Sequence, residues 1–322
     1  RDSSTSRGLG DVYKRQATLR PRLRSYLALL VLIPALVLAG HAQAAAKKLK
    51  IGVTLHPYYS FVANIVGDRA EVVTLIPGEA NPHNYQPQPA DITRAMTLDA
   101  LVVNGIGHDE WAGAIVKAAG RSANLPIIQA NASVALIPIG GDQSGAKVVN
   151  PHTFVSTTAA IQQVFEITRR LGELDPDNAA TYRRNAMAYA GRIRALRAQF
   201  MNRLAGLDLS TFRCATTHAG YDYLMQEFGL FVSAVIEPRH GVAPTARQLA
   251  NTIEAIKKAK VRVLFAEKTF SLDLAKPIEA ATGVKVFALS HITSGTYSAD
   301  EFEIAMAENL ETLAKAVEYT QQ

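Results

Sequence analysis

The chain has 322 residues, of which 48% are hydrophobic and 19% are charged, and this balance excludes a disordered or fibrous protein. Residues 1–44 hold seven basic and two acidic residues, which leaves 27 of the 34 basic and 26 of the 28 acidic residues in the rest of the chain. A body this close to neutral gives no electrostatic case for binding nucleic acid. The length is enough for about two domains of roughly 150 residues each.

The first 44 residues are not expected to belong to the folded protein. Residues 1–16 show no apolar periodicity and are interpreted as a translated cloning or sequencing artefact. Residues 17–44 combine three arginines, an apolar run of 14 residues at Tyr26–Ala39 and small residues at the end, which is typical of a cleavable signal peptide. The run is shorter than the roughly 20 residues of a membrane span. We therefore expect cleavage after about Ala44, export to the periplasm, and a mature protein that is not embedded in the membrane.

The rest of the chain alternates between short apolar runs and segments of helical periodicity, a pattern typical of parallel strands connected by helices. The predicted strands are Leu49–Leu55, Glu71–Ile76, Ala100–Asn104, Pro126–Ala130, Phe212–Thr216, Phe231–Ile236, Val261–Ala266 and Val284–Leu289. A hairpin is expected within Val134–Val149. Capping-box patterns open the helices that are predicted at Thr245–Lys258 and Ser298–Glu318.

One long helix is predicted between the two series of strands. Asp175 is a preferred N-cap residue and Pro176 suits the first helical position; a helix of about 30 residues would be roughly 45 Å long. We predict an α/β fold of two lobes, each a mostly parallel sheet flanked by helices, joined by this long rigid helix. The N-terminal lobe is placed at 45–174, the linking helix at 175–207 and the C-terminal lobe at 208–322.

Any metal site must use histidine and carboxylate ligands, because Cys214 is the only cysteine and its apolar neighbours predict burial. His83 lies in a proline-rich loop, His152 comes immediately before a helix, and His218 ends a strand. Ligands of open α/β folds sit at the carboxyl ends of strands, so these three imidazoles are the candidate ligands. Packing or surface roles are expected for the other histidines at strand ends and in loops, which are His56, His108 and His240.

Around these three histidines the sequence resembles the periplasmic solute-binding proteins of zinc and manganese ABC transporters, most closely the zinc-uptake (ZnuA-like) type. The resemblance extends from Lys48 to about Tyr319. It rests on the order and spacing of KIGVTLHPYYSFVANIVGD, PGEANPHNYQPQPADI, ALVVNGIGHDEW, NPHTF, LGELDPDNAATYRRNA, THAGYDYLMQEFGL, IEPRHGVAPTARQL and VLFAEKTFS. It implies two lobes that are rigidly connected by a long helix, with the metal bound in the cleft between them.

The resemblance also implies which residues bind the metal. His83 and His152 match the ligands of the first lobe, and His218 matches the first ligand of the second lobe. Manganese-binding relatives carry a Glu at this last place, so a third imidazole favours Zn²⁺.

The fourth ligand departs from the family pattern. Its usual Asp falls where this chain has Ser290. The neighbouring His291 is the expected fourth ligand, with Glu267 or a water molecule as alternatives. The histidine-rich loop common in zinc-uptake members has no counterpart at 140–148, where the chain contains no histidine.

The resemblance implies a monomeric protein that is not an enzyme. It would capture Zn²⁺ in the periplasm and deliver it to an inner-membrane ABC permease, whose partner ATPase drives import. A manganese- or iron-binding member of the same family is the main alternative. A zinc hydrolase would use the same three histidines with an activated water and Glu267 as base. A metal-dependent surface adhesin is disfavoured, since no lipid-anchor cysteine follows the apolar run.

Overall fold

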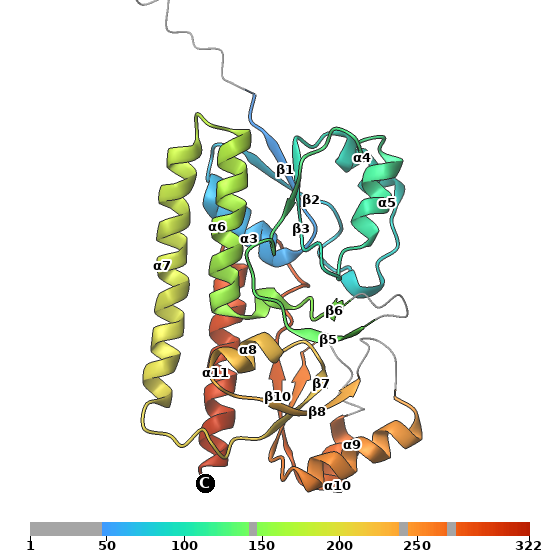
Figure 1. Ribbon diagram of the computed structural model, residues 1–322, viewed down its shortest axis with the longest axis vertical. Coiled ribbons are helices and arrows are strands. Elements are labelled where there is room, and N and C mark those ends of the chain that lie inside the picture. The colour runs from blue at the N-terminus through green and yellow to red at the C-terminus, as the bar shows by residue number, and fades with distance from the viewer. Residues whose placement is uncertain (1–46, 142–146, 238–243, 269–274) are drawn as a thin grey trace, which may run out of the picture. The chain divides into compact units, whose positions relative to one another are not determined.

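Two four-stranded parallel sheets, one from each half of the chain, form the framework of the protein (Figure 1). The structure, a computed structural model, describes residues 47–141, 147–237, 244–268 and 275–322. The predicted artefact at 1–16 and signal peptide at 17–44 lie outside the described residues. Lys48–Gln322 forms one compact unit. Within the described part of the chain, no helix combines the length and the apolar character that a membrane span requires.

The first sheet contains the predicted strands of the first lobe. In the spatial order β2-β1-β3-β4, its members are β1 (Lys50–Val53), β2 (Glu71–Thr74), β3 (Ala100–Val103) and β4 (Ile127–Gln129). The helices that connect them are α3 (His56–Val66), α4 (Pro89–Met96) and α5 (Trp111–Ala118). All neighbouring strands are parallel. The apolar β3 is buried along its whole length, as expected for a parallel strand that is covered on both faces.

The second sheet repeats this arrangement in the C-terminal half. In the spatial order β10-β9-β7-β8, its strands are β7 (Cys214–His218), β8 (Val232–Glu237), β9 (Val263–Glu267) and β10 (Lys285–Leu289). The helices of this half are α8 (Asp222–Glu227), α9 (Ala246–Lys258), α10 (Ala275–Thr282) and α11 (Glu301–Thr320). Its strand pairs are again parallel, so the predicted α/β fold with two mostly parallel sheets is confirmed.

The first lobe also contains shorter elements. The predicted hairpin is confirmed as the antiparallel pair β5 (Pro138–Gly141) and β6 (Lys147–Val149). Two single turns of 3₁₀ helix, η1 (Pro82–Asn84) and η2 (Thr153–Val155), occupy loops of the first lobe. These turns lie at the places where the sequence has His83 and His152.

Two long helices pack side by side along one flank of the molecule (Figure 1). They are α6 (Thr157–Leu174) and α7 (Ala179–Leu204). With 26 residues, α7 is about 39 Å long. It packs against α3 and α6 of the first lobe and against α11 of the second. The long helix therefore contacts both lobes, as a rigid connection requires.

The start of α7 differs from its prediction. Asp175 is the C-cap residue of α6, and α7 begins at Ala179 after Asn178. The Asp175 carboxylate accepts hydrogen bonds from Asn178 Nδ2 at 2.9 Å and from the Tyr182 hydroxyl at 2.6 Å. The prediction of Asp175 as the N-cap is therefore wrong, because these residues form the tight turn that reverses the chain between two antiparallel helices.

One of the two predicted capping boxes is present. At the start of α9, the Gln248 N–H donates to the Thr245 hydroxyl, and the Thr245 N–H donates to the Gln248 side-chain oxygen. This confirms the prediction for α9. The box predicted at Ser298 is wrong, because α11 begins at Glu301 after Asp300. The Ser298 hydroxyl donates instead to the Asp300 carboxylate at 2.5 Å.

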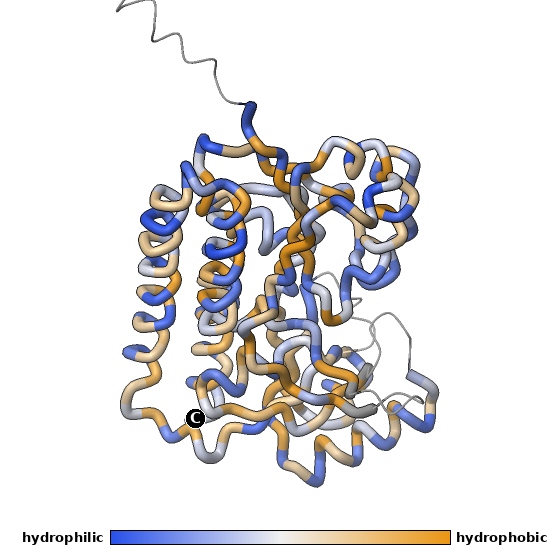
Figure 2. The backbone as a smooth tube through the Cα atoms, turned by 45° about the horizontal axis from the view of Figure 1, so that its top comes forward, coloured by the Kyte–Doolittle hydropathy of each residue, from blue (hydrophilic) through white to orange (hydrophobic). Residues whose placement is uncertain are grey.

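A single buried apolar cluster extends through both lobes. Phe61 of α3 packs edge-on against Phe302 of α11, with ring centroids 4.8 Å apart, and contacts Tyr189 of α7 at 6.1 Å. Cys214 is buried in the same cluster, as predicted. Figure 2 shows the hydrophobic segments running through the strands, while the helices alternate between hydrophobic and hydrophilic turns. Because separating the lobes would expose this shared core, large hinge motion is unfavourable.

Candidate metal centre

Four histidines from four separate segments meet between the two sheets. His83 lies in η1, and His152 immediately precedes η2. His218 is the last residue of β7, and His291 follows the end of β10 by two residues. Each side chain is thus placed at a strand end or at the start of a helical turn, two from each half of the chain.

The four imidazoles are close enough to share one ion. Each offers a ring nitrogen, and these four nitrogens lie within 4.8 Å of one another. The Nε2 atoms of His152 and His218 are 3.0 Å apart. Two nitrogens bound to tetrahedral Zn²⁺ at about 2.0–2.1 Å would be about 3.3 Å apart. His152, His218 and His291 are buried, while His83 is half-buried, so the group lies just below the surface.

Of the alternatives for a fourth ligand, His291 is the one the structure brings to the other three. The Ser290 hydroxyl accepts a hydrogen bond from the backbone N–H of Ile292. Glu267 ends β9 and is buried, but it is not among the four residues of the close group. Within the described residues, this group has four imidazoles and no carboxylate.

The η1 turn fixes the backbone of His83. Asn81 caps the turn, and its side-chain oxygen accepts a hydrogen bond from the His83 N–H at 3.0 Å. The indole of Trp111 on α5 donates to the carbonyl of Pro82 at 3.0 Å. With Pro82 restricting the backbone, the loop holds the imidazole in place through local bonds and one tertiary bond.

Asn150 sets the orientation of the His152 ring. Its amide nitrogen donates to the carbonyl of Ala219 at 2.9 Å and to the carboxylate of Asp222 at 2.8 Å, so its oxygen faces His152. Nδ1–H of His152 donates to that oxygen at 2.6 Å. This bond leaves Nε2 as the nitrogen that points to the cluster, the arrangement usual for a metal-binding histidine.

A matching bond orients His291. Its Nδ1 lies 2.9 Å from the hydroxyl oxygen of Thr293. Asn309 of α11 bonds both backbone groups of the preceding residue, accepting from the N–H of Ser290 at 2.7 Å and donating to its carbonyl at 2.9 Å. The loop after β10 is therefore fixed to α11, and the imidazole is held towards the other three.

The surroundings of His152 favour its neutral form. Burial lowers the pKa of His152 well below its usual value, and positive charge on His291, His108, His218 or His83 would lower this pKa further. Only the neutral imidazole offers a lone pair to a cation. The site therefore holds His152 in the form that binds metal at neutral and mildly acidic pH.

A fifth histidine, His108, lies beside the four. His108 was expected to have a packing or surface role; it is buried, as a packing role requires, and its ring centroid lies 4.0 Å from that of His83. Its position in the sequence could have indicated this: His108 follows β3, which neighbours β1 in the sheet, and therefore emerges at the same sheet edge as the candidate ligands of this lobe.

Two histidines of the mature chain remain, His56 and His240, and the structure describes only the first. His56 stacks on Tyr297 with ring centroids 3.9 Å apart, and its Nε2 lies 3.0 Å from the carbonyl oxygen of Gly295. It is not part of the close group. His240 lies outside the described residues.

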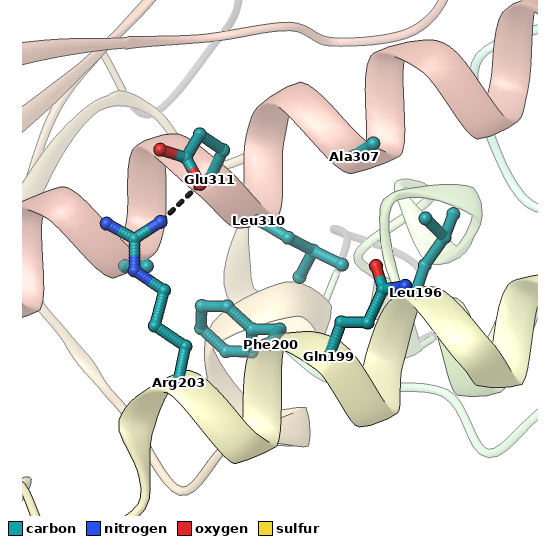
Figure 3. A pocket seen from close by; sticks show the side chains of 8 residues that line it. Leu196, Gln199, Phe200, Arg203, Ala307, Leu310 and Glu311 are labelled. Atoms are coloured by element: carbon teal, nitrogen blue, oxygen red, sulfur yellow. Dashed lines mark hydrogen bonds and ion pairs between the residues drawn. The ribbon is translucent and has the colours of Figure 1, made fainter.

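Two surface hollows help to locate the centre. One borders the cluster and is lined by His83, His108, Glu110 and residues of the β5–β6 hairpin. The other, shown in Figure 3, lies between α7 and α11 and is bridged by an ion pair between Arg203 and Glu311. None of the clustered histidines lines this second hollow, so the chemistry of the site belongs to the first.

Comparison with known proteins gives one family. A family model described as "Zinc-uptake complex component A periplasmic" matches residues 51–316. The solved structure of the solute-binding protein FpvC from Pseudomonas aeruginosa in complex with Mn²⁺ is 50% identical and has a TM-score of 0.81. The similarity covers 85% of this chain and all of that chain. The Ni²⁺ complex of FpvC is also 50% identical, with a TM-score of 0.80, covering 85% of this chain and 98% of that chain.

A curated relative names a different metal. The iron-binding protein YfeA of Yersinia pestis is 30% identical over 253 residues, which cover 77% of this chain and 79% of YfeA. The names of these similar proteins and complexes thus include zinc, manganese, nickel and iron. The family binds divalent metals, and its members differ in the metal they are named for.

Proposed function

Because the chain belongs to the ZnuA family of periplasmic metal-binding proteins of ABC importers, we propose that it captures Zn²⁺ for import. Neutral imidazoles of His83, His152, His218 and His291 would bind the ion at about 2.0–2.1 Å. The ion is the cargo of the protein and not a catalytic cofactor. The protein would act as a transport component without enzymatic turnover.

The observation that carries this proposal is the convergence of four imidazole nitrogens, two from each lobe, within 4.8 Å. Imidazole suits Zn²⁺, whereas Mn²⁺ prefers carboxylate, carbonyl and water oxygens. Four imidazoles without a carboxylate therefore support zinc over manganese. A closed shell of four protein ligands also argues against the hydrolase alternative, since catalytic zinc keeps an open position for water.

The partners follow from the family. Solute-binding proteins of ABC importers work with a membrane permease and an ATPase, so we propose that the loaded protein docks, as a monomer, on an inner-membrane permease. The location would be the periplasm, which the description of the matching family supports. Release of the ion would follow small shifts of the loops that carry the imidazoles, because the lobes share one core.

A competition titration with a zinc chelator tests the ligand set. We expect His83→Ala, His152→Ala, His218→Ala and His291→Ala each to weaken zinc binding by about tenfold or more, because each removes one of four ligands. The matched control is His56→Gln, which replaces a buried imidazole outside the close group with a side chain that still donates a hydrogen bond. If all four alanine variants lost less than about threefold in affinity, the site would be refuted.

The runner-up is a member of the family whose cargo is manganese or iron. The 50% identity to FpvC, which was solved with Mn²⁺ and Ni²⁺, favours this alternative. Elemental analysis of the protein purified from periplasm without added metal separates the two. Zinc close to one equivalent supports the proposal, while near-stoichiometric manganese or iron with little zinc overturns the metal assignment.

A further inference from the structure

We infer that His108 is a fifth imidazole ligand, which gives the site a coordination number above four. This inference rests on the proposed function, because it extends the same site. It also predicts which cations gain most from the added ligand: first-row divalent ions that take five or six ligands.

The position of the ring is the first argument. The His108 ring centroid lies 4.0 Å from that of His83, 4.8 Å from that of His152 and 5.2 Å from that of His291. The ring centroids of the four clustered histidines are themselves 4.7–5.5 Å apart. His108 is thus as near to three members of the cluster as they are to one another.

Burial is the second argument. Only 4% of His108 is exposed, and its ring also packs edge-on against Phe154, with centroids 5.3 Å apart. A ring placed among other imidazoles at the border of a surface hollow can offer a nitrogen to an ion that enters there.

The backbone is the third argument. His108 has φ of 95°, in the left-handed region that favours glycine. Strained residues of this kind persist where the surrounding structure holds them, and they cluster at binding sites. The holding group is Asp109, whose buried carboxylate accepts hydrogen bonds from the hydroxyl of Thr54 at 2.6 Å and from the N–H groups of Asn104 and Gly105 at 2.6 and 3.1 Å.

The same loop is tied to the loop of His152. The side-chain amide of Asn104 donates to the carbonyl of Gly107 at 2.6 Å and to that of Pro151 at 3.1 Å. The residues immediately before His108 and before His152 are therefore connected through one side chain. The strained loop presents His108 in a fixed relation to an imidazole that belongs to the cluster.

A fifth nitrogen changes what the site prefers. The group of ring nitrogens within 4.8 Å of one another does not include His108, so the ion must draw its side chain inward to complete the shell. Zn²⁺ in protein sites is usually satisfied by four ligands. Ni²⁺ commonly takes more, so the added imidazole should benefit Ni²⁺ more than Zn²⁺.

The test compares two ions and two variants of one residue. His108→Asn and His108→Gly suit the positive φ, and thermal unfolding of the apoproteins verifies that both fold. We expect each variant to weaken Ni²⁺ binding by about tenfold or more and Zn²⁺ binding by less than about threefold. Equal effects on the two ions, or no effect on Ni²⁺, would overturn the inference.

A second readout observes the His108 ring directly in the loaded wild-type protein. In the Co²⁺-loaded protein, ring N–H protons of bound imidazoles give strongly shifted proton resonances that disappear in D₂O. Wild-type protein labelled with ¹⁵N-histidine should show one such signal assigned to His108, and His108→Asn should lack it. A His108 ring N–H signal at an ordinary chemical shift in the loaded wild type would overturn the inference.

Failure of this inference is distinct from failure of the proposed function. His152→Ala and His218→Ala serve as the reference. If these variants lose both ions while His108→Asn loses neither, the four-imidazole site stands and only the fifth ligand is refuted. If they also retain both ions, the metal site itself is refuted, and the fifth ligand with it.

Discussion

Two side chains outside the proposed ligand set orient two of the imidazoles. Asn150 accepts from Nδ1–H of His152, and the Thr293 hydroxyl lies at hydrogen-bond distance from Nδ1 of His291. Because Asn150 also donates to Ala219 and Asp222 of the second lobe, one amide orients His152, a proposed ligand from the first lobe, and anchors it to the second. The geometry of the site therefore also depends on residues that orient the proposed ligands.

The role of Asn150 leads to a prediction about affinity. Asn150→Ala should weaken Zn²⁺ binding by about 10–100-fold, because His152 loses the bond that fixes its tautomer and ring orientation. Chelator competition measures the change. Asn124→Ala, which removes an amide whose bond to Arg121 lies on the surface, is the matched control. Affinity unchanged in Asn150→Ala would mean that the ring needs no such support.

The buried imidazoles also predict how the stability of the apoprotein depends on pH. The pKa of His152 is lowered by burial, and burial also lowers the pKa of His56. In the unfolded chain, His pKa values are about 6.5. Below this pH the unfolded chain therefore binds protons at these two histidines, while the folded chain keeps them neutral. Stability should be fully present above about pH 6.5 and should fall as pH drops below it towards the lowered pKa values.

Urea unfolding of the metal-free protein between about pH 7.5 and 5.5 measures this dependence. His152→Asn should show a shallower decline, because it removes a histidine whose pKa is lowered in the folded chain. Apoprotein that is more stable at the acidic end of this range would contradict the account.

At the scale of elements, the strands could be predicted because parallel strands buried on both faces read as short apolar runs. β3 and β7 are examples, buried along their whole length. Helix starts were harder. The N-cap prediction at Asp175 and the capping box at Ser298 were wrong, because both side chains bond within the turns that precede the helices. A capping pattern in the sequence does not show which of two nearby turns will use it.

Like the elements, the candidate site could be predicted only in part from the sequence. His83, His152 and His218 could be singled out because each lies at a junction between elements. His108 was missed because the sequence does not reveal that its loop, with a left-handed backbone, turns the ring inward. Strand order, which decides which loops become neighbours, depends on tertiary packing and was equally hidden.

The start of α6 gives a prediction at this scale. Glu227 of α8 accepts hydrogen bonds from Thr157 N–H at 2.9 Å, from the hydroxyls of Ser156 at 2.8 Å and Thr157, and from Arg197 Nε at 2.9 Å. Glu227→Ala should lower the free energy of unfolding by about 1–3 kcal/mol, because partly buried donors lose their acceptor. Chemical denaturation measures the loss.

The control for this change is Glu173→Ala, which removes an exposed carboxylate that pairs with Arg169 and Arg170 at the end of the same helix. Exposed pairs contribute little to stability. Equal losses in the two variants would show that the buried carboxylate has no special role in capping α6.

At the scale of the whole molecule, loops of the two lobes meet beside the metal centre. The N–H of Gly295 donates to the carbonyl of Gly78 at 3.1 Å, and His56 stacks on Tyr297. The Ser60 hydroxyl donates to the carbonyl of Ser298 at 2.8 Å. Together with the shared apolar core, these bonds hold the lobes in one arrangement, which keeps the imidazoles of both lobes in register.

The close approach of Gly78 and Gly295 predicts a sharp effect. A Cβ at Gly78 would overlap the carbonyl oxygen of Gly295. Gly78→Ala should therefore lower the free energy of unfolding by about 1–3 kcal/mol and weaken metal binding, because the loops before His83 and after His291 are forced apart.

Gly191→Ala is the matched control. A Cβ at Gly191 would meet no atom within 4 Å, and Ala is favoured over Gly inside a helix by about 0.5–1 kcal/mol. Denaturation and chelator competition measure both variants. If Gly78→Ala bound metal like the wild type and unfolded no more easily, the two loops would have more freedom than their contact indicates.

Anomalous diffraction from crystals of the zinc-loaded protein tests the central claim most directly. The account predicts a single strong peak between the lobes, at about 2.0–2.1 Å from ring nitrogens of His83 and His152 on one side and of His218 and His291 on the other. A peak bound by side chains of one lobe alone, or located away from these four rings, would contradict it.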